Sequence, residues 1–271
     1  MYLDSAQAEL CTGVNPSGVH QNIARTCLIL EVLAIASKRG LRLTDVVQKT
    51  KLKKTVVHRA LAGLVCYDLA IFDDRTSRYF IGDRIFGWTE KAKERFGLAE
   101  RVKPYIRSLA DVLEDTCLFC IMRGNEMICY ARAEGSFPIR TLTLNAGTRR
   151  PLGVGSGGLA IAAFLSDERI AELLEIQREE RQRFGVDDAH LLRGIAETRE
   201  LGYAFHKGLF AEDMGGLAVP VRNSSGDVVA SVTVNALRSR LEVDRRPAIA
   251  ETLRREVARI EKDLGQLLDE L

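Results

Sequence analysis

Apolar residues recur at helical spacing in the first quarter of the chain, and at strand-like spacing in several later segments. Between residues 21 and 38 one helical stripe carries Ile23, Cys27, Leu30 and Ala34. Gly40 follows this stripe and favours a helix end. The pattern therefore predicts a first helix that presents one apolar face to a partner.

The segment from Leu41 to Leu64 predicts a short helix, a turn at residues 50–52 and a second helix. Thr44 is suited to cap the first helix, because its hydroxyl oxygen can accept a free backbone N–H group. The apolar face of the second helix carries Val57, Ala60, Leu61 and Leu64. A different face carries Thr55, His58, Arg59 and Ala62, with Lys53 and Lys54 at the N-terminal end. A helix built in this way suits the reading of DNA, although a solvated basic face is the plainer interpretation.

Two short apolar runs follow, at 70–72 and 79–82, around a charged turn. This arrangement predicts a β-hairpin. Three helices and a hairpin make a winged helix-turn-helix. The tip of the hairpin then carries Arg75, Thr76, Ser77 and Arg78, of which the two arginines suit backbone phosphates or ordinary solvation.

The rest of the chain mixes helical and strand patterns. Helices are expected at 83–96, 98–114, 156–165, 167–183 and 187–201, and in a last segment carrying Ile249, Leu253, Val257, Ile260, Leu264 and Leu268. Strands are expected at 116–122, 127–133, 139–145, 217–222 and 228–235. The fold class is therefore α+β, with an antiparallel sheet and helices in the C-terminal part. The expected division is a mobile arm at 1–18, a DNA-binding domain at 19–82, a linker helix at 83–97 and a sensor-like domain at 98–271.

The distribution of charged residues along the chain supports this division into domains. Residues 21–85 hold 12 Lys and Arg against 6 Asp and Glu, whereas residues 86–271 hold 27 against 29. The excess positive charge therefore lies in the segment that would need to neutralise phosphates. The arm at 1–18 has no Lys or Arg, which argues against its reaching into a DNA groove.

Other features limit the class of protein. The chain has no signal-peptide pattern and no apolar run long enough to cross a membrane, so we expect a cytoplasmic protein with no membrane association. Cys117 and Cys120 match CxxC, but odd spacing on a strand places their sulfurs on opposite faces. We therefore expect buried free thiols, with no metal and no cofactor.

A glycine-rich loop opens the helix expected at 156–165. It reads PLGVGSGGLA from Pro151 to Ala160. Ser156 is suited to cap the helix, and the free N–H groups near Gly157, Gly158 and Leu159 would suit a carboxylate. A purely structural glycine turn is the alternative.

Three more specific motifs do not match this loop. A phosphate-binding Walker loop needs a lysine that is absent, and a dinucleotide fingerprint needs a second strand where the pattern is helical. A nucleophile elbow needs glycine where Val154 stands. No convincing catalytic constellation is present elsewhere, so we do not expect an enzyme.

Taken together, these segments resemble the IclR family of bacterial transcriptional regulators over residues 21–268. The resemblance is carried in order by LTDVVQKTKLKKTVVHRAL, SRYFIG, RRPLGVGSGGLAIAAFL, LGYAFHKG and GLAVPVRNSSGDVVASVTVN. It implies a winged-helix DNA-binding domain, a linker helix and a GAF-like effector domain that binds small organic acids. It also implies a homodimer or tetramer on a pseudopalindromic operator of double-stranded DNA.

The resemblance further implies two sets of site residues. By their positions in the chain, the residues expected to contact DNA are Thr44, Lys53, Lys54, Thr55, His58, Arg59, Arg75 and Arg78. Carried over by position from the family, the residues expected to line the effector cavity are Leu142, Leu144, Ser156, Gly157, Gly158, Phe210, Pro220, Thr233 and Asn235. Leu159 stands where the family usually has lysine, and KGLFAEDMGG lacks its usual acidic pair. An enzyme or metabolite-handling module, or a protein-interaction scaffold without a working sensor, remains the alternative.

Overall fold

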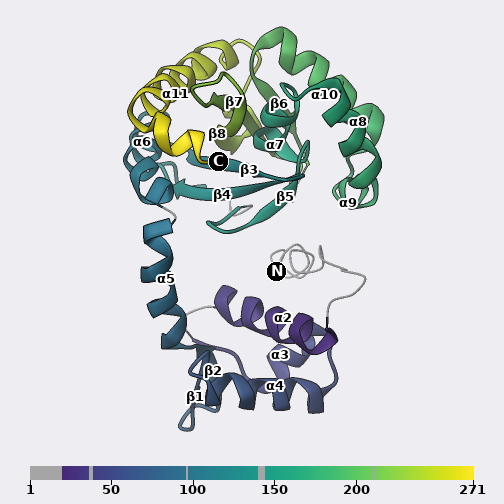
Figure 1. Cartoon of the computed structure of the whole chain (residues 1–271), viewed down its shortest axis with the longest axis vertical. Coiled ribbons are helices and arrows are strands. Elements are labelled where there is room, and N and C mark those ends of the chain that lie inside the picture. The colour runs from purple at the N-terminus through teal and green to yellow at the C-terminus, as the bar shows by residue number, and fades with distance from the viewer. Residues whose placement is uncertain (1–19, 37–38, 96, 140–143, 210) are drawn as a thin grey trace. The chain divides into compact units, whose positions relative to one another are not determined.

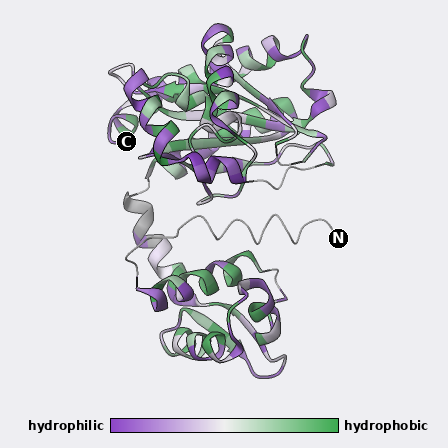
Figure 2. Ribbon diagram, turned by 90° about the vertical axis from the view of Figure 1, so that its right-hand side faces the viewer, coloured by the Kyte–Doolittle hydropathy of each residue, from purple (hydrophilic) through white to green (hydrophobic). Residues whose placement is uncertain are grey.

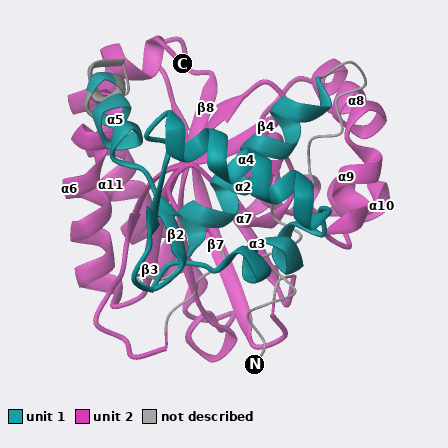
Figure 3. Ribbon diagram, turned by 90° about the horizontal axis from the view of Figure 1, so that it is seen from below, with its two compact units in different colours: residues 1–95 teal, residues 96–271 magenta. Residues whose placement is uncertain are grey.

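The computed structural model describes residues 20–36, 39–95, 97–139, 144–209 and 211–271. The chain divides into two compact units, residues 1–95 and 96–271 (Figure 3). None of the described helices is both long and apolar enough to span a bilayer. The expected arm at 1–18 lies outside the described residues.

Unit 1 contains helices around a small core and a two-stranded sheet (Figure 1). Its helices are α2 (Gln21–Ile35), α3 (Leu43–Thr50), α4 (Lys54–Cys66) and α5 (Asp83–Arg95). The core is formed by apolar residues of α2, α3 and α4 together with the first strand: Ile29, Val32, Leu33, Val46, Val57, Leu61, Leu64 and Ala70. The apolar face predicted for the second helix is confirmed in α4, where Val57, Leu61 and Leu64 are buried. The stripe predicted for the first helix is wrong, because α2 buries Ile29, Val32 and Leu33, whereas Ile23, Cys27 and Ala34 are exposed.

The start of α3 corrects the expectation for Thr44. The helix begins at Leu43, so Thr44 lies in its first turn and does not cap it. The backbone N–H of Arg42 instead donates to the Asp45 carboxylate at 2.8 Å. This carboxylate also lies at the positive end of the helix dipole, where a negative charge is favourable. Lys51, with φ of 56°, then turns the chain from α3 toward α4.

The hairpin consists of β1 (Ala70–Asp73) and β2 (Arg78–Ile81), paired antiparallel from Ala70 with Ile81 to Asp73 with Arg78. It is joined to the loop before α3 by two backbone hydrogen bonds between Leu41 and Tyr79, at 2.7 and 3.0 Å. The Arg78 guanidinium also donates to the Gly40 carbonyl at 2.9 Å. The hairpin is therefore fixed to the same body as α3 and α4.

Unit 2 is built on a curled antiparallel sheet, which has six strands within the described residues. The strand order is β5-β4-β3-β8-β7-β6. The strands are β3 (Thr116–Arg123), β4 (Glu126–Ala133), β5 (Arg149–Pro151), β6 (Ala204–Lys207), β7 (Met214–Arg222) and β8 (Val228–Leu237). Figure 2 shows that apolar residues run along these strands.

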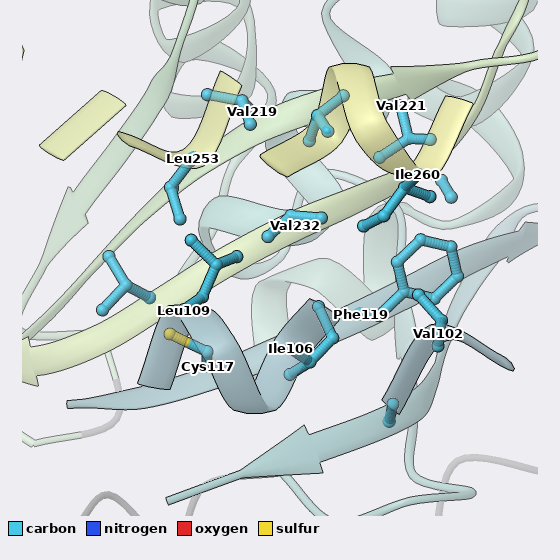
Figure 4. Close-up of a cluster of buried hydrophobic side chains, with 14 of the residues drawn as sticks. Val102, Ile106, Leu109, Cys117, Phe119, Val219, Val221, Val232, Leu253 and Ile260 are labelled. Atoms are coloured by element: carbon cyan, nitrogen blue, oxygen red, sulfur yellow. The ribbon is translucent and has the colours of Figure 1, made fainter. Parts of the chain in front are cut away.

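The two faces of this sheet differ in chemistry. One face packs on α6 (Gly97–Leu113) and α11 (Arg246–Asp269), and its core is apolar (Figure 4). Cys117 belongs to this face and Cys120 to the other, so the prediction that their sulfurs diverge is confirmed. Every apolar residue predicted for the last helix is buried.

The second face is covered by α7 (Gly155–Ala162), α8 (Asp167–Ile176), α9 (Arg178–Arg183) and α10 (Asp188–Leu201). The Ser166 hydroxyl caps α8 by accepting the Arg169 N–H at 3.2 Å. The Asp187 carboxylate caps α10 by accepting the His190 N–H at 2.7 Å. With these caps, α8 begins at the predicted residue, and α10 begins one residue after the predicted start because Asp187 is its capping residue.

Several segments differ from the sequence predictions. The helix expected at 167–183 is broken at Gln177 into α8 and α9. Strands β5 and β6 were not predicted, and β7 begins three residues before the expected start. Of the strand expected at 139–145, residues 140–143 lie outside the described residues, and the remaining three are not in a strand.

Candidate functional site

A basic and polar row lies along α4, opposite the side that faces the core. The five residues of this row are all exposed: Lys53, Lys54, Thr55, His58 and Arg59. Val57, Leu61 and Leu64 of the same helix are buried. We call the exposed row the α4 polar face. It carries donors and positive charge toward solvent, and Thr44 is also exposed in the first turn of α3.

The hairpin places its two arginines differently. Arg75 is exposed in the turn, and Asp73 accepts its backbone N–H at 3.0 Å. Asp73 also accepts the Thr76 hydroxyl at 2.6 Å, and this bond is the main cause that lowers the pKa of Asp73. Arg78 is half-buried, at the start of β2, and bonds Gly40. The expectation that Arg78 sits at the tip is therefore wrong, because the strand begins at Arg78.

A small cavity lies between α7 and the second face of the unit 2 sheet. Its volume is about 20 Å³, which is room for about one water molecule. The described residues that line it are Cys120, Met127, Leu144, Gly155, Ser156, Gly157, His206, Met214, Gly215, Thr233 and Asn235. Among these described residues there is no lysine, arginine, aspartate or glutamate.

Three buried hydroxyl groups lie at this cavity: Ser156 and Thr233 line it, and Ser231 lies beside it, next to Gly157. Ser156, Ser231 and Thr233 are 2%, 0% and 3% exposed. None of the three has a hydrogen-bond partner among the described residues. A buried hydroxyl without a partner costs free energy, so three in one place mark a position where a polar ligand could be held.

Two glycines bring these groups together. A Cβ at Gly157 would lie 2.9 Å from Oγ1 of Thr233 and 3.1 Å from Oγ of Ser231. A Cβ at Gly216 would lie 2.5 Å from Oγ of Ser156 and 2.6 Å from Oδ1 of Asn235. The absence of these side chains therefore allows α7 to approach the polar row of the sheet.

Ser156 does not cap α7 as predicted. The helix begins at Gly155 with Val154 as the capping residue, so Ser156 lies inside the first turn. Its hydroxyl is directed to the cavity side instead of to its own backbone. The first-turn N–H groups of the helix, from residues 155–157, have no intrahelical acceptor by helix geometry and present the positive end of its dipole.

His206 lies on the same face as the hydroxyl groups. It pairs with Gly216 across β6 and β7, and Gly216 pairs with Asn235 across β7 and β8. Burial is the main cause that lowers the pKa of His206 to about 4, and the charge of His190 adds to the effect. The imidazole is therefore neutral near pH 7.

The structure brings together five of the nine residues predicted for the cavity: Leu144, Ser156, Gly157, Thr233 and Asn235. Gly158 instead packs against the backbone of Pro151 and Gly153, and Pro220 does not line the cavity. Leu142 and Phe210 lie outside the described residues.

Several residues at or beside the cavity are not predicted from the sequence: Cys120, Met127, His206, Met214 and Ser231. Ser231 could have been found, because Ser231, Thr233 and Asn235 alternate with buried valines along β8. His206 could not, because its position depends on the pairing of an unpredicted strand.

These two units, one of helices with a hairpin and one of helices on a curled antiparallel sheet, match known regulators. The sequence model of the family described as bacterial transcriptional regulator IclR, C-terminal, matches residues 90–262. The chain is 28% identical over 244 residues to the HTH-type transcriptional regulator BhcR of Paracoccus denitrificans, covering 89% of this chain and 86% of the relative. The chain therefore belongs to the IclR family of bacterial transcriptional regulators.

Solved structures agree on the fold. The IclR of Thermotoga maritima has a TM-score of 0.70 at 17% identity, covering 91% of this chain and 100% of that chain. An IclR homologue from Microbacterium hydrocarbonoxydans, solved in complex with 4-hydroxybenzoate, has a TM-score of 0.69 at 21% identity. The match covers 90% of this chain and 98% of the homologue.

Proposed function

We propose that this regulator binds DNA sequence-specifically, and that a small organic acid modulates the binding. Residues 19–82 serve as a winged helix-turn-helix, 83–97 as a linker helix and 98–271 as the effector-binding domain. The α4 polar face carries the first part of this proposal, because all five of its residues are exposed on a helix whose other side is buried. A basic, exposed helix following a tight turn is suited to the major groove.

Each residue of the α4 polar face has a proposed task. Thr55, His58 and Arg59 face base edges, while Lys53 and Lys54 contact phosphates at the start of the helix. Thr44, in the first turn of α3, contacts the DNA backbone. A homodimer or tetramer would place two such faces on a pseudopalindromic operator. Protection of two half-sites in a footprint, together with the mass in solution, tests this arrangement, and protection of a single half-site would contradict it.

The unpartnered hydroxyl groups carry the second part of the proposal. Ser156, Ser231 and Thr233 can donate to a ligand, and the first turn of α7 adds N–H groups. This set suits a carboxylate. The homologue solved with 4-hydroxybenzoate supports an organic acid as the class of effector for this chain.

The size of the cavity favours a second candidate. With room for about one water molecule, the domain could serve as a scaffold that binds no effector. In the effector proposal, Met127 and Met214 move aside, since unbranched methionines repack readily. A thermal-shift series against aliphatic and aromatic carboxylates separates the two. A ligand at 100 times its Kd adds about 2.7 kcal/mol of stability, and no shift in either class would favour the scaffold.

Arg75→Ala is expected to lower the salt dependence of operator binding. We propose that Arg75 contacts a phosphate beside the groove, because it is exposed in the turn, whereas Arg78 is held by Gly40. Each lost phosphate contact reduces the slope of log K against log salt by about one unit for each bound copy. The exposed Arg193 of unit 2 provides the control, because Arg193→Ala removes the same charge and should leave the slope unchanged. An unchanged slope in Arg75→Ala would exclude the contact.

Ser231→Ala is expected to stabilise the protein without effector. Its hydroxyl is fully buried and has no partner among the described residues, so its removal relieves a desolvation cost of about 1–3 kcal/mol. Urea unfolding of unit 2 measures the change. Ser166→Ala is the control of opposite sign, because it removes a helix cap worth about 1 kcal/mol. A loss of stability in Ser231→Ala would show that the hydroxyl is satisfied.

A further inference from the structure

Among the described residues that line the cavity, His206 is the one whose side chain can gain a positive charge. Across three strands, His206, Gly216 and Asn235 form one row on the face that α7 covers. Gly216 has no side chain, and the Ser156 hydroxyl and the Asn235 amide lie over it. The His206 imidazole is the next group along the row and lines the same cavity.

A carboxylate held in this cavity needs compensation of its charge. Burying an unpaired carboxylate is costly, and the described lining has no lysine or arginine. The first turn of α7 supplies N–H groups and a partial positive charge. Among the described lining side chains, His206 alone can become a cation, since Asn235, the hydroxyls and the thiol of Cys120 cannot.

We propose that His206 receives the carboxylate of the effector and takes up one proton from solvent when the carboxylate binds. This inference rests on the proposed effector function. The proton resides on the imidazole in the complex and returns to solvent when the effector leaves. The affinity for the effector therefore increases as the pH falls. The fraction of regulator with bound effector then depends on the pH as well as on the effector concentration.

The surroundings of His206 favour such a change. In the protein without effector, burial and the nearby His190 of α10 keep the imidazole neutral, with a pKa of about 4. The α7 N-terminus also disfavours a cation there. From β3, Cys120 lines the cavity, and a hydrogen bond with Cys129 together with burial raises the pKa of its thiol, so it stays neutral. Glu212 and Asp213, in the turn before β7, are exposed. None of the described residues that line the cavity is an aspartate or glutamate, so a bound carboxylate would add a negative charge beside the imidazole and raise the pKa of His206.

The test uses the full chain with 4-hydroxybenzoate and pyruvate as probes. Calorimetry in phosphate and in Tris at one pH gives the number of protons taken up, since the two buffers differ in ionisation enthalpy. Between pH 8 and 5.5 the probes stay ionised, because carboxyl pKa values lie near about 4. We expect uptake of up to one proton and a Kd that falls by up to about tenfold for each pH unit.

Variants assign the proton. His206→Asn and His206→Gln should remove the pH slope, whereas His190→Asn, at an exposed position on α10, should keep it. The neutral 4-hydroxybenzamide should bind, if at all, without a slope. A Kd that does not depend on pH, or equal proton uptake in the His206 variants, would overturn this inference alone. Failure of both acids to bind the unaltered protein at any pH would overturn the proposed effector function and this inference together.

Discussion

Phe119→Ala is expected to lower the free energy of unfolding of unit 2 by about 3–5 kcal/mol. The Phe119 ring is fully buried on the apolar face of the sheet, between α6 and α11 (Figure 4). Its removal loses the transfer free energy of the ring and leaves a cavity that tightly packed neighbours cannot fill. Urea unfolding followed by circular dichroism measures this change. The chain's one tryptophan, Trp88, lies in unit 1 and reports that unit separately.

Val112→Ala provides the control for this prediction. Val112 lies on α6 but is 67% exposed, so its truncation should change the stability by no more than about 0.5 kcal/mol. A loss below about 1 kcal/mol in Phe119→Ala would contradict the packing of α6 and α11 on this face. An equal loss of stability in both variants would show that burial of the Phe119 ring does not determine the loss.

Arg59→Ala is expected to weaken binding to the operator by about 1–3 kcal/mol, or roughly 5- to 150-fold. Arg59 is exposed on the α4 polar face, near the middle of the helix, and a guanidinium there can make two hydrogen bonds to a guanine edge. The loss should be largest for the operator and small for unrelated DNA, so base preference relaxes. Mobility shifts on the operator and on single-base variants measure both effects.

Lys53→Ala is the matched comparison, since it removes one positive charge at the start of α4. It should weaken binding to all sequences about equally, as expected for a phosphate contact. If Arg59→Ala weakens all sequences equally as well, Arg59 is a phosphate contact and base reading lies elsewhere on the helix. If neither variant affects binding, the α4 polar face is not the DNA interface.

The sequence pattern predicted the helices that bury one face. For α11, six apolar residues at helical spacing are buried against the sheet, and this one-sided burial is what periodicity measures. The break between α8 and α9 has another cause. The buried Arg181 donates to the Leu173 and Leu174 carbonyls at the end of α8 and pairs with Asp188 at 2.6 Å. Such a tertiary contact ends a helix without any signal in the local pattern.

The candidate cavity was predicted in part for a similar reason. Thr233 and Asn235 were predicted from the family resemblance, and both line the cavity because a strand alternates its side chains between two faces. The prediction that Ser156 caps the helix is wrong, because the capping residue of α7 is Val154, two residues earlier in the glycine loop. His206 depends on the register of β6 with β7, and a four-residue strand with mixed polarity gives too little pattern to predict that pairing.

The bonds that join the hairpin to the loop before α3 have a consequence for the free energy of association. Leu41, Tyr79 and Arg78 hold the turn of the hairpin and α4 in one body before any DNA is present. In the proposed complex, the loss of translational and rotational freedom is then incurred once for both contacts, because the second contact forms at a high effective concentration. A hairpin on a free tether would lose further entropy on ordering, so the same contacts would contribute less affinity.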